Sequence, residues 1–149
     1  MEAESIQRAD YRQASLAYQA LQAVDRHVAS GPLEARLVEM VKVRVSQMNG
    51  CAFCLDYHHT AALAAGLEPR QLAVLAAWRE APLFSARERA ALAWAEALTR
   101  VAEKGVPDEL YALASRHFSP EELVDLAYAV AAINAFNRLG VAFHRPLPA

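Results

Sequence analysis

Residues 39–66 read EMVKVRVSQMNGCAFCLDYHHTAALAAG and contain both cysteines of the chain. The helix-favouring run before Asn49 and Gly50 is expected to stop at this pair, because an Asn-Gly dipeptide marks a turn. A second helical run carries the cysteines and ends at Gly66. We therefore expect residues 33–48 and the cysteine-bearing segment to form an antiparallel helical hairpin.

The spacing of the cysteines and histidines predicts which of them share a helix face. If the second helix begins near Cys51, then Cys51, Cys54 and His58 are spaced i, i+3 and i+7 and fall on one stripe. Cys54 and His58 are direct i, i+4 neighbours. His59 points roughly a quarter-turn away and is the weaker candidate.

Two effects favour a thiolate in this stripe. The start of the helix offers free backbone N–H groups and the positive end of the helix dipole. A protonated His58 beside Cys54 adds a second stabilising charge. Such a dithiol can attack a peroxide or a disulfide, after which the second thiol closes the ring.

Glu39 is the further candidate in the hairpin. In an antiparallel pair it lies level with residues near Thr60, closer to His58 than to Cys51. A carboxylate at this place could orient His58 and hold its proton. From the spacing alone, however, such a glutamate is more often a solvated helix residue that pairs with Lys42.

Other interpretations of the cysteine pair also follow from the residues. The thiols could be inert and buried. A zinc site would use Cys51, Cys54, His58 and His59, but adjacent histidines on one helix diverge, and a zinc site normally has a second ligand pair. A structural disulfide is disfavoured in a reducing compartment, where a C-x-x-C pair more often binds metal or cycles.

The rest of the chain predicts an all-α single domain over residues 1–149 with six or seven helices. Alanine dominates with Leu, Glu, Arg and Gln, and no strand-like alternation persists. Ser85 with Glu88 forms a capping box, and Ser119 precedes Pro120 at another helix start. The expected helices cover residues 10–29, 33–48, the cysteine segment to 66, 68–78, 85–105, 107–118 and 119–144.

Composition limits the partners. Hydrophobic residues make up 55% and charged residues 21% of the chain, which excludes disorder and hints that a partner subunit covers some apolar surface. The net charge of -2 gives no electrostatic case for nucleic acid or an anionic membrane.

The polar N-terminus, MEAESIQRADYRQ, has no apolar signal core, so we expect a cytoplasmic protein. The large aromatic residues are expected to pack in the core or at an interface: Trp78, Trp94, Phe84 and Phe136.

The combined pattern resembles the alkylhydroperoxidase AhpD-like family, within the carboxymuconolactone decarboxylase superfamily. The resemblance is carried by Glu39, eleven residues, the C-x-x-C pair, three residues and His58. The later segments AAWREAPLFSARERAALAWAEALT and INAFNRLGVAFH are also similar to the family, so the likeness extends over about residues 11–144.

The resemblance implies an AhpD-like helical bundle that assembles as a homo-oligomer, a trimer or a hexamer. It implies an antioxidant peroxidase in which Cys54 is the peroxidatic cysteine, Cys51 the resolving cysteine, His58 the relay and Glu39 the supporting carboxylate. The free N–H groups and the positive dipole end at the helix start by themselves favour Cys51 as the nucleophile. The expected contact with His58 and the resemblance favour Cys54. The cycle needs a peroxide and an external dithiol reductant, in this family a lipoyl-bearing protein, and no metal or organic cofactor.

The sequence also departs from the family. Its best-known members carry a histidine directly before the second cysteine, and here that position is Phe53. The chain therefore lacks one proton-relay group of the family. The alternative enzyme class is a general disulfide oxidoreductase or a redox sensor. A zinc-binding structural module is the alternative from another class. Decarboxylase or lactone-type members of the superfamily generally lack the cysteine pair, so its presence argues against that activity.

Overall fold

The computed structural model describes residues 6–149, and the first five residues of the polar N-terminal segment lie outside the described part. The described chain is helical throughout and contains no strand, which confirms the all-α prediction. It has eight α-helices and two 3₁₀ turns, where six or seven helices were expected. In chain order they are η1 (Tyr11–Gln13), α1 (Ser15–Ala29), α2 (Ala35–Asn49), α3 (Ala52–Ala64), α4 (Pro69–Val74), η2 (Leu75–Ala77), α5 (Ala86–Thr99), α6 (Val101–Lys104), α7 (Asp108–Ser115) and α8 (Pro120–Ala142).

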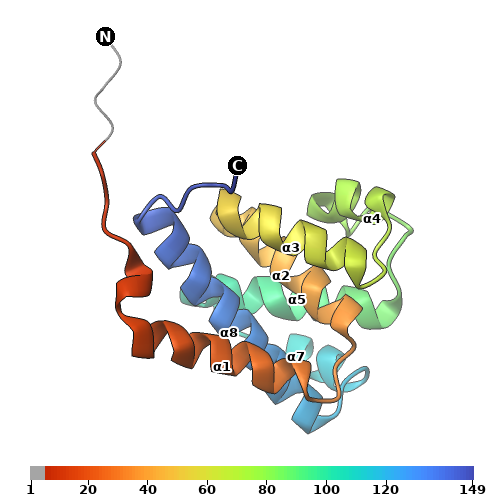
Figure 1. Ribbon diagram of the computed structural model, residues 1–149. Helices are drawn as coiled ribbons and strands as arrows, with labels where there is room; N and C mark the ends of the chain where they lie inside the picture. Colours follow the sequence, from red (N-terminus) through yellow and green to blue (C-terminus); the bar gives the residue numbers. More distant parts are fainter. Residues whose placement is uncertain (1–5) are drawn as a thin grey trace.

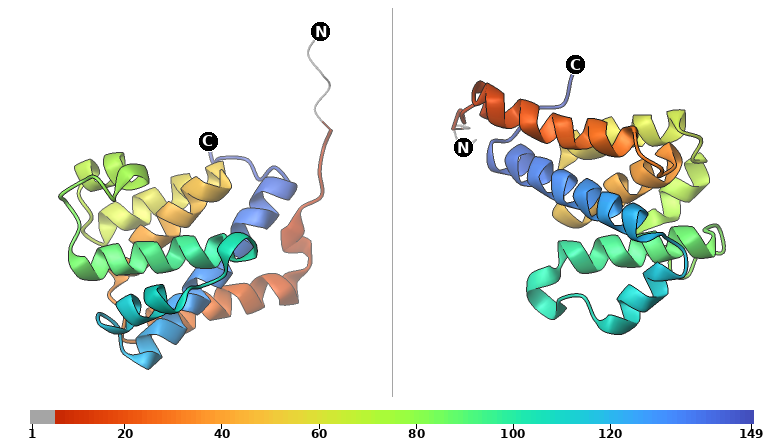
Figure 2. Two further views of the ribbon diagram at one scale, coloured as in Figure 1. Left: turned by 180° about the vertical axis from the view of Figure 1, so that it is seen from behind. Right: turned by 90° about the horizontal axis from the view of Figure 1, so that it is seen from below.

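The long helix α8 organises the fold. It runs through the middle of the molecule and packs against α1, α2, α3, α5 and α7 (Figure 1). Figure 2 shows α5 and α7 on the side of α8 that lies behind it in Figure 1. Helix α2 packs along α8, and its last residue, Asn49, hydrogen-bonds Asn134 and Asn137, so the cysteine segment that follows lies against the C-terminal half of α8. Within residues 6–149, no helix combines the length and apolar character that crossing a bilayer requires.

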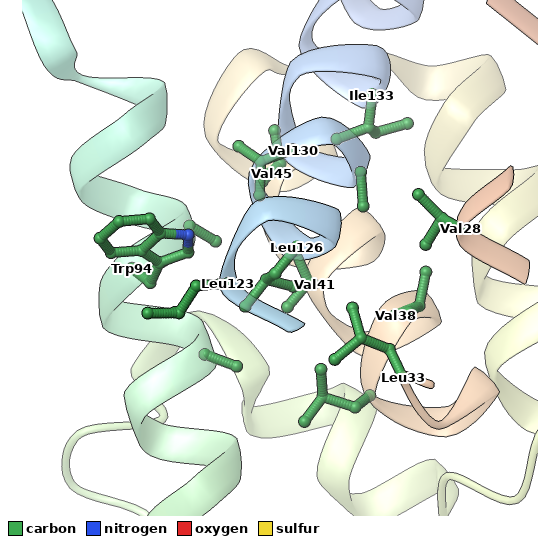
Figure 3. Close-up of a cluster of buried hydrophobic side chains, with 14 of the residues drawn as sticks. Val28, Leu33, Val38, Val41, Val45, Trp94, Leu123, Leu126, Val130 and Ile133 are labelled. Carbon is green, nitrogen blue, oxygen red and sulfur yellow. The ribbon is translucent and has the colours of Figure 1, made fainter. Parts of the chain in front are cut away.

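The main core lies where α1, α2 and α5 meet α8. Aliphatic side chains from α2 and α8 interdigitate, and Trp94 of α5 closes one side (Figure 3). Both cysteines belong to this cluster, so the dithiol is built on the most rigid part of the fold. A second cluster lies beneath α4 and η2 and includes Met40, Leu72, Leu75, Trp78 and Leu92.

The predicted helix starts at residues 85 and 119 are confirmed. The Ser85 side chain accepts a hydrogen bond from the backbone N–H of Glu88, and Glu88 reaches back to the N–H of Ser85. Ser119 and Glu122 form the same box, with Pro120 at the first helical position. These reciprocal bonds satisfy backbone donors that a helix start would otherwise leave unpaired.

Three predicted helices are interrupted in the structure. The segment 10–29 divides at Ala14, because Asp10 caps a separate 3₁₀ turn by accepting the N–H of Arg12, and α1 begins only at Ser15. The segment 85–105 divides at Arg100, which lies between β-branched residues and leaves helical geometry. The segment 68–78 passes from α4 into the tighter turn η2.

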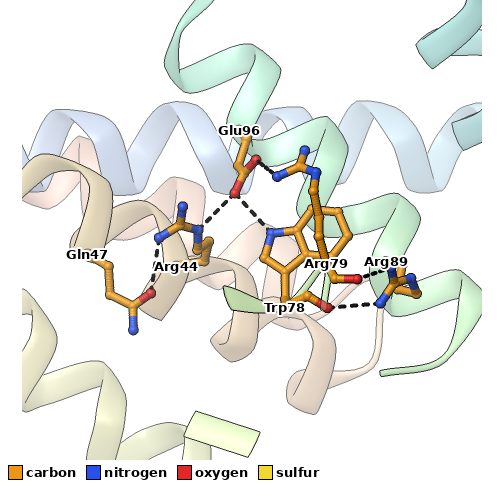
Figure 4. A network of polar contacts seen from close by, with 6 residues as sticks. All are labelled: Arg44, Gln47, Trp78, Arg79, Arg89 and Glu96. Carbon is orange, nitrogen blue, oxygen red and sulfur yellow. Dashed lines mark hydrogen bonds and ion pairs between the residues drawn. The ribbon is translucent and has the colours of Figure 1, made fainter. Parts of the chain in front are cut away.

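A buried acidic side chain ties α5 to two other elements (Figure 4). Glu96 of α5 accepts hydrogen bonds from Arg44 Nε at 2.9 Å, Trp78 Nε1 at 2.9 Å and Arg79 Nη1 at 2.7 Å. The Arg79 guanidinium also lies over the Trp78 ring, 4.2 Å from its centroid. This cluster links α2, α5 and the segment after η2, and its charges are paired as burial requires.

Candidate active site

The turn between α2 and α3 places the dithiol. Asn49 is the last residue of α2, and Gly50 adopts the left-handed conformation with φ 67° and ψ 36°, which favours glycine. The N–H of Gly50 donates to the carbonyl of Ser46 at 2.9 Å. The chain therefore reverses at the predicted position and enters α3 with Cys51 as the N-cap residue.

The two cysteines are joined as a disulfide, with their Cα atoms 5.3 Å apart. The backbone N–H of Cys54 donates to Cys51 Sγ at 3.3 Å, so the first sulfur receives the free donor of the helix start. Exposed fractions are 1% for Cys51 and 5% for Cys54. The fold thus holds both sulfur atoms at bonding distance and shields them from bulk water.

Glu39 lies against His58, and it also lies near Lys42. His58 Nδ1 and Glu39 Oε2 are 2.8 Å apart, which joins the two helices of the hairpin. The other carboxylate oxygen of Glu39 is 3.9 Å from Lys42 Nζ, which lies 3.3 Å from Asp25 Oδ1 on α1. The two contacts considered for Glu39 from the sequence therefore occur together, in a row of alternating charges.

A cavity of about 150 Å³ opens beside this row. Cys54 and His58 both line it, and Cys51 does not, which distinguishes the two sulfur positions. Phe136 packs against the main core, as expected, and also forms part of this wall. The lining residues are Tyr18, Gln22, Asp25, Phe53, Cys54, Tyr57, His58, Phe136 and Arg145.

Close packing of α8 on the sulfurs depends on Gly140, a residue that the sequence interpretation overlooked. A Cβ atom at Gly140 would lie 2.8 Å from Cys51 Sγ and 3.7 Å from Cys54 Sγ. The signal available in the sequence was a lone glycine inside a long helical run, which often marks a close approach. Tyr18, Asp25 and Arg145 were also missed, because they come from distant segments that no local spacing connects to the cysteines.

An amide network fixes the α2–α3 turn onto α8. Asn49 Nδ2 donates to Asn134 Oδ1 at 2.9 Å and to Asn137 Oδ1 at 3.0 Å. The fully buried Asn137 donates in turn to Ser46 Oγ at 3.0 Å. These bonds hold the start of α3, and with it the dithiol, at a fixed position relative to α8.

The four residues considered as a zinc set are not all brought together. His59 is exposed on the outer face of α3, whereas His58 is buried against Glu39. Over residues 6–149, no group of three or more His, Cys, Asp and Glu side chains is arranged to hold a metal ion.

Comparisons with known proteins agree on the family to which the chain is related. Residues 15–97, more than half of the chain, match the carboxymuconolactone decarboxylase family. The uncharacterized protein YdfG of Bacillus subtilis (strain 168) is 38% identical over 119 residues, covering 80% of this chain and 81% of YdfG. The crystal structure of ATU0492 from Agrobacterium tumefaciens, described as a protein of unknown function and a candidate antioxidant defence protein AhpD, superposes with a TM-score of 0.90. It is 39% identical, over 97% of this chain and 99% of that chain.

A more distant structure shares the fold alone. The debrominase Bmp8 superposes with a TM-score of 0.78 at 21% identity, over 93% of this chain and 74% of that chain. A shared fold does not determine the chemistry, so the activity has to be argued from the site. The family match, the identity to YdfG and the likeness to ATU0492 nevertheless establish the relationship itself: the chain belongs to the carboxymuconolactone decarboxylase family, in its AhpD-like group.

Proposed function

We propose that the protein is a thiol-dependent peroxidase that reduces hydroperoxides with the Cys51–Cys54 dithiol. The observation that carries this proposal is the position of Cys54. It lines a cavity together with His58, while its partner Cys51 lies at bonding distance and is not part of the cavity wall. His58 is held in turn by Glu39. The site thus contains a nucleophile (Cys54), a base (His58) and a carboxylate that orients the base (Glu39).

The reaction proceeds in three balanced steps. The Cys54 thiolate attacks the distal oxygen of the hydroperoxide, the O–O bond breaks, and the alkoxide takes a proton and leaves as an alcohol, or as water when the substrate is hydrogen peroxide. The resulting Cys54 sulfenic acid condenses with the Cys51 thiol and releases water. An external dithiol then reduces the Cys51–Cys54 disulfide by exchange and becomes a disulfide itself.

His58 carries the proton through these steps. With Nδ1 donating to Glu39, Nε2 is the ring atom that can take the thiol proton and return it to the departing alkoxide. Glu39 orients the ring and balances the imidazolium charge, and the charged row continues through Lys42 to Asp25, which itself lines the cavity. The cycle as written uses only cysteine thiols and the external dithiol, for which a lipoyl-bearing protein is the reductant that the family resemblance implies. We place this cycle in a reducing compartment such as the cytoplasm.

A general disulfide oxidoreductase is the second candidate. The same dithiol supports exchange with any accessible disulfide, and Phe53 stands where the best-known AhpD proteins carry an additional relay histidine. This candidate predicts rapid reaction with small disulfides and little reaction with hydroperoxides.

Product analysis separates the two candidates. Reduced protein mixed with one equivalent of cumene hydroperoxide should yield one equivalent of cumyl alcohol and a Cys51–Cys54 disulfide, identified by peptide mass spectrometry. Cys51→Ser should also form the alcohol but stop at a sulfenic acid that dimedone traps, and Cys54→Ser should form no alcohol. Oxidation by small disulfides with no alcohol from the hydroperoxide would reject the peroxidase in favour of the disulfide oxidoreductase. A sulfinic acid as the only product of the wild type would reject the resolving role of Cys51.

A further inference from the structure

Arg145 lies in the wall of the same cavity as Cys54, although it is far from the cysteines in the sequence. The chain turns back after α8, and the backbone N–H of Arg145 donates to the carbonyl of Gly140 at 3.0 Å. Its guanidinium lies over the ring of Phe53, with the central carbon 3.6 Å from the ring centroid. Phe53, one of the two residues between the cysteines, is therefore the platform that this cation contacts.

The Arg145 side chain makes a single hydrogen bond within residues 6–149. Its side chain donates to the hydroxyl of Tyr11 at 2.7 Å, and no carboxylate among residues 6–149 forms an ion pair with it. The nearby acids have cations of their own. Asp10 is paired with Arg12, Asp25 with Lys42, and Glu39 with His58 and Lys42. A guanidinium has five N–H donors, so most of the hydrogen-bonding capacity of Arg145 faces the cavity and solvent.

The Arg145 side chain is also fixed before any ligand arrives. Tyr11, which accepts its hydrogen bond, packs on Tyr18 and Phe143 with ring centroids 6.0 Å and 6.1 Å apart. Tyr18 continues this aromatic row to Phe136 at 6.2 Å. A cation that contacts the rings of Phe53 and Tyr11 loses little further freedom when it binds an anion, which favours affinity.

These observations point to the substrate class, and we propose that the cavity takes organic hydroperoxides that carry a carboxylate. The proposal rests on the peroxidase function above. The planar guanidinium of Arg145 matches a carboxylate with two parallel hydrogen bonds. The rings of Phe53, Tyr18 and Phe136 surround the apolar body of the substrate, and the O–O group meets Cys54. A neutral hydroperoxide of the same shape gains the apolar contacts alone.

A matched pair of substrates tests this directly. Single-turnover rate constants of the reduced protein are measured with cumene hydroperoxide and with its para-carboxylate derivative. The wild type should prefer the carboxylate by about tenfold to a hundredfold, the range of a hydrogen bond between charged groups. Arg145→Gln should abolish that ratio, and Arg145→Lys should keep part of it, because lysine retains the charge without the planar fork. Arg116→Gln, an exposed arginine at the end of α7, makes the same charge change and should keep the full ratio.

The outcomes are distinguishable. If the wild type reacts with both hydroperoxides at the same rate, the substrate class is wrong while the peroxidase function stands. If Arg145→Gln slows both substrates equally, the arginine stabilises the thiolate and does not select the substrate, and the proposal fails.

A second readout does not depend on turnover. Benzoate, but not benzyl alcohol, should bind the oxidised wild type in an NMR titration, and Arg145→Gln should lose that binding. Benzoate binding by a protein that consumes no hydroperoxide would overturn both the proposed function and this substrate class, leaving only a carboxylate site.

Discussion

At the scale of single residues, the site depends on Gly140, because this residue has no side chain. Helix α8 passes so close to the dithiol that a methyl group at this position would contact Cys51 Sγ at 2.8 Å. Real Cβ atoms do not approach sulfur this closely, so either α8 or the α3 start has to shift. The buried sulfurs cannot move away easily, because both belong to the main core.

Gly140→Ala is therefore expected to destabilise the protein despite the better helix propensity of alanine. Overpacking a core costs about 1–3 kcal/mol, and replacing glycine in a helix returns about 0.5–1 kcal/mol. The unfolding free energy in urea should fall by about 1 kcal/mol. Val141→Ala, at the exposed neighbouring position, is the control and should change stability much less. A Gly140→Ala protein as stable as the wild type would show that α8 is not in contact with the sulfurs.

Glu39 is the residue whose role depends most on the peroxidase proposal. Glu39→Gln keeps a side chain of the same shape but removes the charge that faces His58 Nδ1. We expect the rate of thiol oxidation by peroxide to fall by about tenfold to a hundredfold, below the full contribution of general acid–base catalysis. The pH profile of Cys54 alkylation by iodoacetamide should move to higher pH, because the thiolate loses the support of a charged imidazole.

Two further measurements separate this effect from a loss of folding. Glu80→Gln, an exposed carboxylate beyond η2, should match the wild type in rate and in profile. In a His58→Asn background, Glu39→Gln should add little further loss, because the two residues act in series. Independent losses of full size from both changes would contradict the assignment.

At the scale of secondary-structure elements, the Glu96 cluster joins α2 to α5 and has a predictable dependence on pH. Burial raises the pKa of Glu96, but the hydrogen bonds from Trp78, Arg79 and Arg44 prevail and hold this pKa below its ordinary value. A carboxyl with a lowered folded-state pKa stabilises the fold above its unfolded pKa, and this stabilisation is lost as the pH falls through the folded-state pKa.

Glu96→Gln should reduce the unfolding free energy at pH 7 by about 3 kcal/mol, because it leaves the buried Arg44 without its counter-ion. It should also flatten the decline in stability below about pH 4.5, the ordinary range of a glutamate side chain. Denaturant unfolding from pH 7 to pH 3 measures both effects. The control is Glu121→Gln, an exposed carboxylate at the start of α8, which should retain the wild-type decline. An unchanged decline in Glu96→Gln would exclude this carboxyl as its source.

The element scale also shows what could be predicted from sequence. The helix starts at Ser85, Ser119 and Cys51 were predictable because capping and turn residues act over three or four positions. The breaks at Ala14 and Arg100 were not, because the flanking segments are themselves helical and tertiary contacts decide where a helix ends. Helical spacing and one turn predicted that Cys51, Cys54 and His58 lie close together, whereas the role predicted for Glu39 came from the family resemblance. Arg145 and Asp25 reach the cavity only through the packing of α1 and of the chain after α8.

At the scale of the whole molecule, the surface suggests self-association, which the family resemblance also implies. Large apolar side chains are exposed along α1 and α8, including Leu16, Val124 and Tyr128. Tyr128 also borders a groove of about 390 Å³ between these helices, lined by Ala20, Ala23 and Val24. An apolar face of this kind is more common at subunit contacts than on a monomer surface.

We expect sedimentation velocity to show a homo-oligomer, a trimer or a hexamer, and Tyr128→Glu to dissociate it by placing a charge in the contact. Val101→Glu changes an equally exposed apolar position on α6 and should leave the assembly intact. A monomeric wild type across the accessible concentration range would contradict the expectation, and dissociation by both variants would indicate general destabilisation.

The central claim is that Cys54 is the nucleophile and Cys51 its resolving partner, and rapid-quench measurement of thiol loss tests it most directly. Fully reduced wild type should lose two thiols for each hydroperoxide consumed, in a reaction that is first order in peroxide. Cys51→Ser should lose its one remaining thiol at a comparable rate, because the peroxide cleavage step still has Cys54 and His58. Cys54→Ser should consume hydroperoxide no faster than a free thiol in solution. Consumption by Cys54→Ser at the wild-type rate would contradict the account.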